Sequence, residues 1–333
     1  MDSPQDITLV KDRFIISDIL ARESTGEQVS AIFSELNAPQ KRISSRYFYD
    51  EYGSFLFEKI TATPEYYLTR TEKSILENIA PILCSDAKFT DIIEPGSGDC
   101  SKISILLDAI PEKILSHIRY IPVDVSMPAI IKSAEFLTSI YPQLEVHGIV
   151  ADFMKHFGSI PEGSKRLICF FGSTIGNLEK AQATGFLQEI EKFMEPEDHF
   201  LLGLDTVKEK SVLEAAYNDS KGITALFNMN ILKVMNDYAH TNFKAREFEH
   251  IAFYNEDKAR IEMHLRARKD VIVESEYFPK PVFLMKGETI HTENSHKYTD
   301  DDIQNFSVVT GLKIEDVYTD DKRWFSVVSF RKT

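Results

Sequence analysis

Apolar strands and amphipathic helices alternate between residues 70 and 205, and this alternation limits the fold more than any other feature of the chain. Short apolar segments predict strands at 89–93, 119–123, 144–150, 166–171 and 199–204. Helical periodicity fills the intervals, and one predicted helix has an apolar face made of Ile103, Leu106, Leu107 and Ile110. Strands separated by helices are typical of a parallel sheet that is covered on both faces. We therefore predict an α/β fold with a Rossmann-like sheet.

The pattern changes on both sides of this block. Residues 69–72 have the pattern of a capping box and predict the start of a helix. Beyond residue 205, the chain is mostly helical over 215–240 and extended over 250–291, notably over 259–273. The last predicted strands, 312–318 and 323–330, flank a short polar turn and predict an antiparallel hairpin. We predict two domains, of which one contains residues 70–205 plus 298–333 and the other, an α+β domain, contains residues 1–69 plus 206–297.

Composition argues against several kinds of partner. The formal net charge of −14 repels phosphate backbones, so we expect no nucleic acid. No apolar run is long enough to span a bilayer, and the N-terminus lacks a secretory signal, so we expect no membrane contact. The three cysteines lack metal-ligand spacing and favour a reducing compartment, the cytoplasm. We expect a monomer without a bound metal, and we interpret His291 and His296 as surface histidines.

Two glycines join the first predicted strand of the block to the helix that follows. Gly96 and Gly98 allow a sharp turn and the close approach of a ligand, and the helix directs unpaired N–H groups toward it. Glu94, two residues before the first glycine, matches the pattern of an adenosyl-methionine site. A dinucleotide fingerprint needs a third small residue, for which Ser101 is only a tolerable substitute. The turn alone leaves open a nicotinamide-dependent oxidoreductase or a non-catalytic binding module.

Acidic residues follow the next two predicted strands where each ends. An open parallel sheet binds its ligand beyond the carboxyl ends of its strands. There, Asp124 can accept the ribose hydroxyls, Asp152 can accept the adenine amine beside Phe153, and Lys102 can pair with a methionine carboxylate. Each acid alone can equally be a helix cap. Their order along one edge favours an adenosyl cofactor.

Four segments together resemble a known family. They are 47–50 (YFYD), 63–72 (TPEYYLTRTE), 171–178 (FGSTIGNL) and 263–268 (MHLRAR). The chain is similar over residues 30–333 to the L-histidine Nα-methyltransferases of ergothioneine biosynthesis. The resemblance implies a class I methyltransferase sheet with a second, substrate-binding α+β domain, and S-adenosylmethionine as cofactor, with S-adenosylhomocysteine as product. It also implies up to three methyl transfers to the α-amino group of L-histidine, which give trimethyl-L-histidine (hercynine).

The resemblance also implies roles for individual residues. Those that hold S-adenosylmethionine are Tyr49, Gly96, Lys102, Asp124, Asp152 and Phe153. Those that hold the amino and carboxylate groups of the substrate are Tyr66, Asn177 and Tyr217, with Gly172 and Thr174 lining the same pocket. Of these, Asn177, Tyr66 and Thr174 are the candidate catalytic residues. Glu293 and Ser295 bind the imidazole, with Phe57 and Met263 packed near it.

The imidazole site distinguishes histidine from other substrates. One ring nitrogen donates to a carboxylate and the other accepts from a hydroxyl, as Glu293 and Ser295 allow. Asn294 and His296 stand where the family usually has apolar or thiol residues, but alternation along a strand turns them away from this pair. An N-methyltransferase of another aromatic amino acid, such as a tryptophan derivative, remains the nearest alternative.

Overall fold

The computed structural model describes residues 7–11, 14–20, 25–85, 88–161, 163 and 165–332. Its contacts divide the chain into two compact units. Unit 1 contains the described residues of Met1–Arg22, Leu68–Val207 and Lys297–Thr333, and unit 2 contains those of Glu23–Tyr67 and Lys208–His296. Within these ranges, we find no helix that is both long and apolar enough to cross a membrane.

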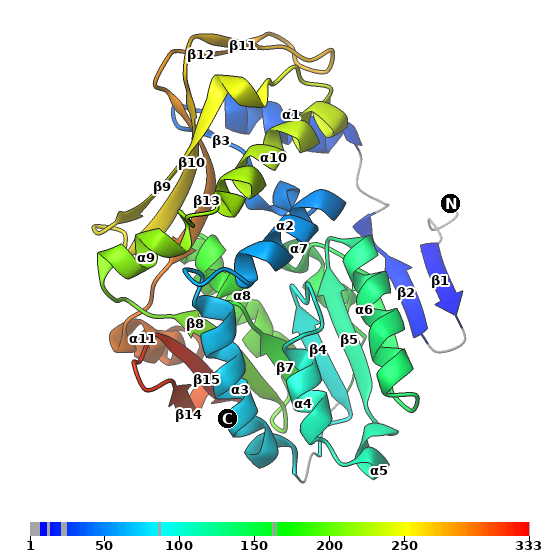
Figure 1. The fold of residues 1–333 in the computed structure, drawn as a ribbon. Coiled ribbons are helices and arrows are strands. Elements are labelled where there is room, and N and C mark those ends of the chain that lie inside the picture. Colours follow the sequence, from blue (N-terminus) through cyan, green and yellow to red (C-terminus); the bar gives the residue numbers. More distant parts are fainter. Residues whose placement is uncertain are drawn as a thin grey trace. The chain divides into compact units, whose positions relative to one another are not determined.

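Unit 1 is built on a nine-stranded sheet with the order β1-β2-β6-β5-β4-β7-β8-β15-β14 (Figure 1). The parallel strands at its centre are β6 (Glu145–Val150), β5 (Arg119–Asp124), β4 (Asp91–Pro95), β7 (Arg166–Phe170) and β8 (His199–Asp205). At one edge, β15 (Phe325–Arg331) pairs antiparallel with β8 and with β14 (Lys313–Thr319). The predicted Rossmann-like sheet and its closing hairpin are confirmed.

The opposite edge of this sheet was assigned wrongly from the sequence. β2 (Phe14–Asp18) pairs in parallel with β6, and β1 (Ile7–Lys11) pairs antiparallel with β2, so both belong to unit 1 rather than to the second domain. Ile16 and Ile130 meet over Gly148, where an added Cβ would lie only 3.3 Å and 2.4 Å from their side chains. The glycine therefore provides the space in which β2 and the helix that contains Ile130 pack together.

Helices cover both faces of the sheet in unit 1. In Figure 1, α3 (Leu68–Cys84), α4 (Ile103–Ala109) and α6 (Met127–Ile140) lie in front of it, whereas α8 (Lys180–Phe193) and α11 (Asp300–Thr310) lie behind. Shorter helices are α5 (Glu112–Leu115) and α7 (Phe153–His156). The chain reverses its direction across the sheet between β4 and β7, since β5 follows on one side of β4 and β7 lies on the other. A ligand is expected at the carboxyl ends of these two strands.

Unit 2 has a sheet with the order β3-β13-β10-β9 and a separate hairpin. Its strands are β3 (Lys41–Arg42), β13 (Thr289–His296), β10 (Arg260–Ala267), β9 (Phe248–Asn255), β11 (Val271–Val273) and β12 (Val282–Leu284). Its helices are α1 (Thr25–Leu36), α2 (Glu51–Thr61), α9 (Lys210–Ala216) and α10 (Ile223–Ala239). The mostly helical segment predicted at 215–240 contains the end of α9 and all of α10, and the extended segment predicted at 259–273 contains β10 and β11. α10 packs on α2, β9 and β10, which places one face of the sheet against a helix.

Candidate functional site

The loops after β4 and β7 meet at the predicted ligand edge of unit 1. Gly96 and Gly98 have φ of +67° and +50°, in the left-handed region that favours glycine. A Cβ on Gly96 would lie 3.6 Å from both Phe153 and Thr174, whereas one on Gly98 would meet nothing within 4 Å. Gly96 thus brings three loops together, and Gly98 faces open space in which a ligand can approach the backbone.

The two strand-end acids hold backbone N–H groups and keep further acceptor capacity. Asp124 accepts from the N–H groups of Gly98 and Ser126, each at 2.9 Å, through different carboxylate oxygens. Asp152 caps α7 by accepting from the N–H of Met154 at 3.0 Å. A carboxylate has about four lone-pair positions, so each acid can also accept hydroxyl or amine protons from a ligand. Burial raises the pKa of Asp124.

Glu94 lies beneath the glycine turn and is not available at the surface. The Tyr120 hydroxyl donates to its Oε2 at 2.5 Å, and the Glu94 side chain is buried. Burial raises the pKa of Glu94 to about 8, although Tyr120 and Lys102 act in the opposite direction. The acid of the motif therefore supports the turn as a largely protonated group at neutral pH.

Lys102 has a buried partner, Glu72, that the sequence pattern does not indicate. Its Nζ lies 2.9 Å from Oε2 of Glu72. The N–H of Gly172 also donates to this carboxylate, and its nitrogen lies 2.8 Å from Oε1 and 2.9 Å from Oε2. The interpretation of residues 69–72 as a capping box is wrong, because α3 already begins at Leu68 and the Glu72 carboxylate bonds to Lys102 and Gly172. The available signal was its position on the apolar stripe that continues through Ile75, Leu76 and Ile79.

A buried ion pair supports the loop 172–177 through Ser173. Ser173 adopts a left-handed conformation with φ of 54°, and its Oγ accepts from the N–H of Asp205 at 3.0 Å. The carboxylate of Asp205 pairs with the Nζ of Lys297 at 2.7 Å, and neither side chain is exposed. This support presents Thr174 and Asn177 at the edge that carries Gly96.

Unit 2 brings together its own share of the predicted residues. A chain of aromatic ring contacts runs through Tyr49, Phe57, Tyr66 and Tyr217, with centroids 5.9 to 6.1 Å apart. The Tyr217 hydroxyl donates to Ser295 Oγ at 2.7 Å. In the pairing of β10 with β13, Met263 lies opposite Glu293. Unit 2 therefore combines aromatic rings with a hydroxyl pair, and Glu293 stands two residues from Ser295 on the same strand.

The predicted site residues divide between the two units. Unit 1 holds Gly96, Lys102, Asp124, Asp152, Phe153, Gly172, Thr174 and Asn177, and unit 2 holds Tyr49, Phe57, Tyr66, Tyr217, Met263, Glu293 and Ser295. Within each unit, segments distant in sequence bring many of them into contact.

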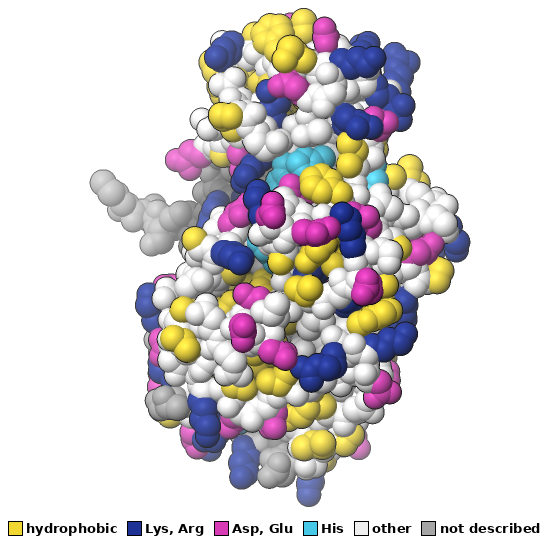
Figure 2. Space-filling view, turned by 90° about the vertical axis from the view of Figure 1, so that its left-hand side faces the viewer, with side chains coloured by type: hydrophobic (Ala, Val, Ile, Leu, Met, Phe, Trp, Pro, Cys, Tyr) yellow, Lys and Arg dark blue, Asp and Glu magenta, His cyan; other side chains and the backbone are white. Residues whose placement is uncertain are grey.

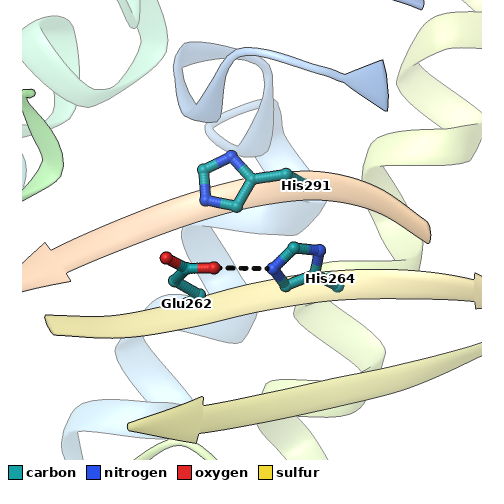
Figure 3. A group of neighbouring side chains, drawn as sticks. All are labelled: Glu262, His264 and His291. Atoms are coloured by element: carbon teal, nitrogen blue, oxygen red, sulfur yellow. Dashed lines mark hydrogen bonds and ion pairs between the residues drawn. The ribbon is translucent and has the colours of Figure 1, made fainter. Parts of the chain in front are cut away.

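His291 and His296 are not surface residues, contrary to the prediction. Both are buried, and His291 of β13 faces Glu262 and His264 of β10 (Figure 3). These three offer one ligand atom each within 4.8 Å of one another. However, Arg260 pairs with Glu262 at 2.8 Å, and His264 Nε2 lies 3.2 Å from the other Glu262 oxygen. A cation would compete with Arg260, so we assign the cluster a structural role.

The cluster shifts the titration of its members. Burial and the neighbouring His264 together lower the pKa of His291 to about 4. Burial also lowers the pKa of His264. For Glu262, burial acts to raise the pKa, but Arg260 and His264 outweigh it and lower the value to about 2. At neutral pH the histidines are therefore neutral and Glu262 is ionised. Asn294 Oδ1 lies 2.9 Å from His291 Nε2, and His296 Nε2 lies 3.5 Å from a terminal nitrogen of Arg260. Both side chains therefore turn toward this cluster and away from Ser295, as alternation predicts.

Comparisons with known proteins agree on one family. Residues 28–332 match the family described as "Histidine-specific methyltransferase, SAM-dependent". The histidine N-alpha-methyltransferase of Mycolicibacterium smegmatis is 37% identical over 92% of this chain and 95% of its own length. The enzyme of the same name from Mycobacterium tuberculosis is 37% identical over 80% and 83%, respectively. Ergothioneine biosynthesis protein 1 of Neurospora crassa is 28% identical over 86% of this chain and 32% of that protein.

Proposed function

This chain belongs to the family of histidine-specific, S-adenosylmethionine-dependent methyltransferases, and we propose that it methylates the α-amino group of L-histidine. Up to three transfers give trimethyl-L-histidine, the first step of ergothioneine biosynthesis. The observation that carries the substrate assignment is the hydrogen bond from Tyr217 to Ser295, because Ser295 lies on the strand that also bears Glu293. The family membership sets aside the nicotinamide-dependent alternative.

The residues at the edge of unit 1 fit the cofactor. Asp124 retains acceptor capacity for ribose hydroxyls, Asp152 for the adenine amine, and Lys102 has N–H donors beyond the one that meets Glu72. Phe153 flanks Gly96, where it can contact the adenosine. We also assign Tyr49 to the cofactor, on the family resemblance. When bound, S-adenosylmethionine supplies the electrophilic methyl group.

The substrate residues act by orientation rather than by strong base catalysis. By the family resemblance, we assign Asn177 and Thr174 to orient the amine, Tyr66 and Tyr217 to hold the amino and carboxylate groups of the substrate, and Gly172 to line the pocket. Positioning the lone pair in line with the methyl group lowers the entropic part of the barrier. Successive methylation removes N–H donors, so repeated transfer requires that the carboxylate and imidazole hold the substrate.

The imidazole residues set the specificity. Glu293 accepts from one ring nitrogen and Ser295 donates to the other, while Met263 and Phe57 pack against the ring. The Tyr217 hydroxyl donates to Ser295 Oγ and so restrains the Ser295 side chain. A bulkier ring without these groups, such as that of a tryptophan derivative, would leave the carboxylate unpaired.

A panel of amino acids tests the substrate. We expect labelled S-adenosylmethionine and histidine to give mono-, di- and trimethylated products by mass spectrometry. Glu293→Ala should lower kcat/KM for histidine by roughly 10- to 100-fold, because a hydrogen bond to a charged group contributes about 1.5–3 kcal/mol. The exposed Glu256→Ala is the control. Methylation of another amino acid but not of histidine would refute the substrate.

We further propose that the enzyme is a cytoplasmic monomer that acts on a small molecule. Cys84, Cys100 and Cys169 are free thiols, which suits a reducing compartment. On the face drawn in Figure 2, acidic and basic side chains are interspersed, and the net charge is −14. Light scattering of the purified protein tests the monomer: a mass near twice 38.1 kDa would contradict it.

A further inference from the structure

Glu72 of α3 is a fully buried carboxylate that joins three separate segments of unit 1. Its Oε1 and Oε2 lie 2.8 and 2.9 Å from the N–H of Gly172, and Oε2 lies 2.9 Å from the Nζ of Lys102. The side chain of Glu72 has no exposed surface, while that of Lys102 is 17% exposed. The carboxylate of this ion pair is therefore buried, and the lysine side chain reaches the surface.

The position is shaped to hold this carboxylate. A buried charge is costly unless it is paired and hydrogen-bonded, and Glu72 meets both conditions through Lys102 and Gly172. Gly203, in the middle of β8, supplies the space, because a Cβ there would lie 2.1 Å from Glu72 Oε1. Any residue larger than glycine at 203 would displace the carboxylate. Because its carboxylate requires a glycine opposite it, Glu72 has a specific role in this part of unit 1.

The two partners of Glu72 lie in the proposed cofactor and substrate sites. A Cβ on Gly172 would be 2.9 Å from Lys102 Nζ and 3.3 Å from Thr174 Oγ1, so the ammonium group lies against the start of the loop that carries Thr174 and Asn177. Gly172 itself has φ of +79°, and the bond from its N–H to Glu72 holds this turn. Displacing Glu72 would release the lysine and the loop together.

We propose that Glu72 is a positioning residue that directs Lys102 toward the amino acid part of the adenosyl cofactor and holds the Gly172 turn. The inference rests on the proposed function. One of the three N–H donors of Lys102 is committed to Glu72, which leaves two for the cofactor's carboxylate. A lysine side chain has high rotamer entropy, so anchoring it before the ligand arrives reduces the ordering cost of binding.

Ligand-selective binding tests this role. Calorimetry compares S-adenosylhomocysteine with 5′-methylthioadenosine, which lacks the amino acid part. Glu72→Gln keeps the shape but not the charge, and we expect it to weaken S-adenosylhomocysteine by about 10-fold, the factor for one charge-assisted hydrogen bond. The affinity for 5′-methylthioadenosine should stay within about twofold, because the adenosine contacts are unchanged. The exposed Glu77→Gln on the same helix is the control.

Two further variants keep the test decisive. Gly203→Ala displaces the carboxylate from the opposite side and should reproduce the same selective loss, even if Glu72→Gln does not fold. In combination with Lys102→Met, the effect of Glu72→Gln should largely disappear, since there is no lysine left to direct. Parallel weakening of both ligands, or an unchanged affinity for S-adenosylhomocysteine, would overturn the proposal. Because the readout needs no histidine, a wrong amino acid substrate would leave these outcomes intact.

Discussion

Acid should destabilise this protein through His291, and the structure sets both the direction and the size of the effect. The imidazole is 7% exposed, its Nε2 lies 2.9 Å from Asn294 Oδ1, and the His264 ring centroid is 4.9 Å away. Burial, the neighbouring His264 and Arg42 lower its pKa to about 4, while Glu262 acts in the opposite direction. Protonating this group in the folded state therefore requires strongly acidic solution.

The sign follows from comparing the folded and unfolded states. The unfolded chain takes up the proton near the ordinary value of 6.5, and the folded chain does so only near pH 4. The stabilising contribution is full above pH 6.5 and is lost as the pH falls from 6.5 to 4. The fall corresponds to about 3 kcal/mol in total, of which about 2 kcal/mol is lost by pH 5. Such a loss is a large part of a typical stability of about 5–15 kcal/mol.

Urea unfolding at pH 7.0, 6.0 and 5.0 measures this effect. His291→Gln does not titrate, and its amide can still donate to Asn294. Between pH 7 and pH 5, we expect the free energy of unfolding of the wild type to fall by about 2 kcal/mol more than that of the variant. The exposed His117→Gln is the matched control and should follow the wild type. Parallel curves for wild type and His291→Gln would refute the reasoning.

Two other variants test the supports of the site. Burial raises the pKa of Glu94 to about 8, so the folded chain keeps this carboxyl mostly protonated at pH 7, whereas the unfolded chain ionises it near 4.5. The contribution of a group with a raised pKa is lost as the pH rises from 4.5 to 8, so between pH 5 and pH 7 we expect the free energy of unfolding of the wild type to fall by about 2 kcal/mol more than that of Glu94→Gln, which does not titrate. Parallel urea-unfolding results for the two proteins at these pH values would contradict the raised pKa. Tyr217→Phe removes the donor to Ser295 and should raise KM for histidine by about 10-fold without changing the affinity for S-adenosylhomocysteine, as steady-state kinetics and calorimetry would measure. An unchanged KM would argue against Ser295 as an imidazole contact.

The fold of unit 1 could be predicted where local pattern and chain order suffice. The strand predicted at 89–93 is β4 (Asp91–Pro95), and that at 199–204 is β8 (His199–Asp205). Each is a short apolar run followed by turn residues, so its own sequence identifies it. The sequence did not locate the breaks after Ala216 and Ala267, because short irregular segments hardly alter the periodicity of a long window.

The site could be predicted in part for a similar reason. Asp124 and Asp152 are noticeable because each follows a strand, and both lie at strand ends in the structure. Glu72 resembled a helix cap, since its neighbours in sequence are compatible with one. His291 and His296 resembled surface residues because their partners Glu262 and Arg260 are on another strand.

By itself, the sequence determined the alternation of strands and helices, the glycine turn and the order of the acids along the chain, because hydrophobic period and backbone conformation are local properties. The tertiary structure decided which sheet β2 joins, which charges are buried and what they meet. Glu72 meets Gly172 across 100 residues of sequence, and β2 joins β6 across a longer stretch of chain. Burial and pairing depend on such distant partners, and their energies enter only when the chain has closed these long loops.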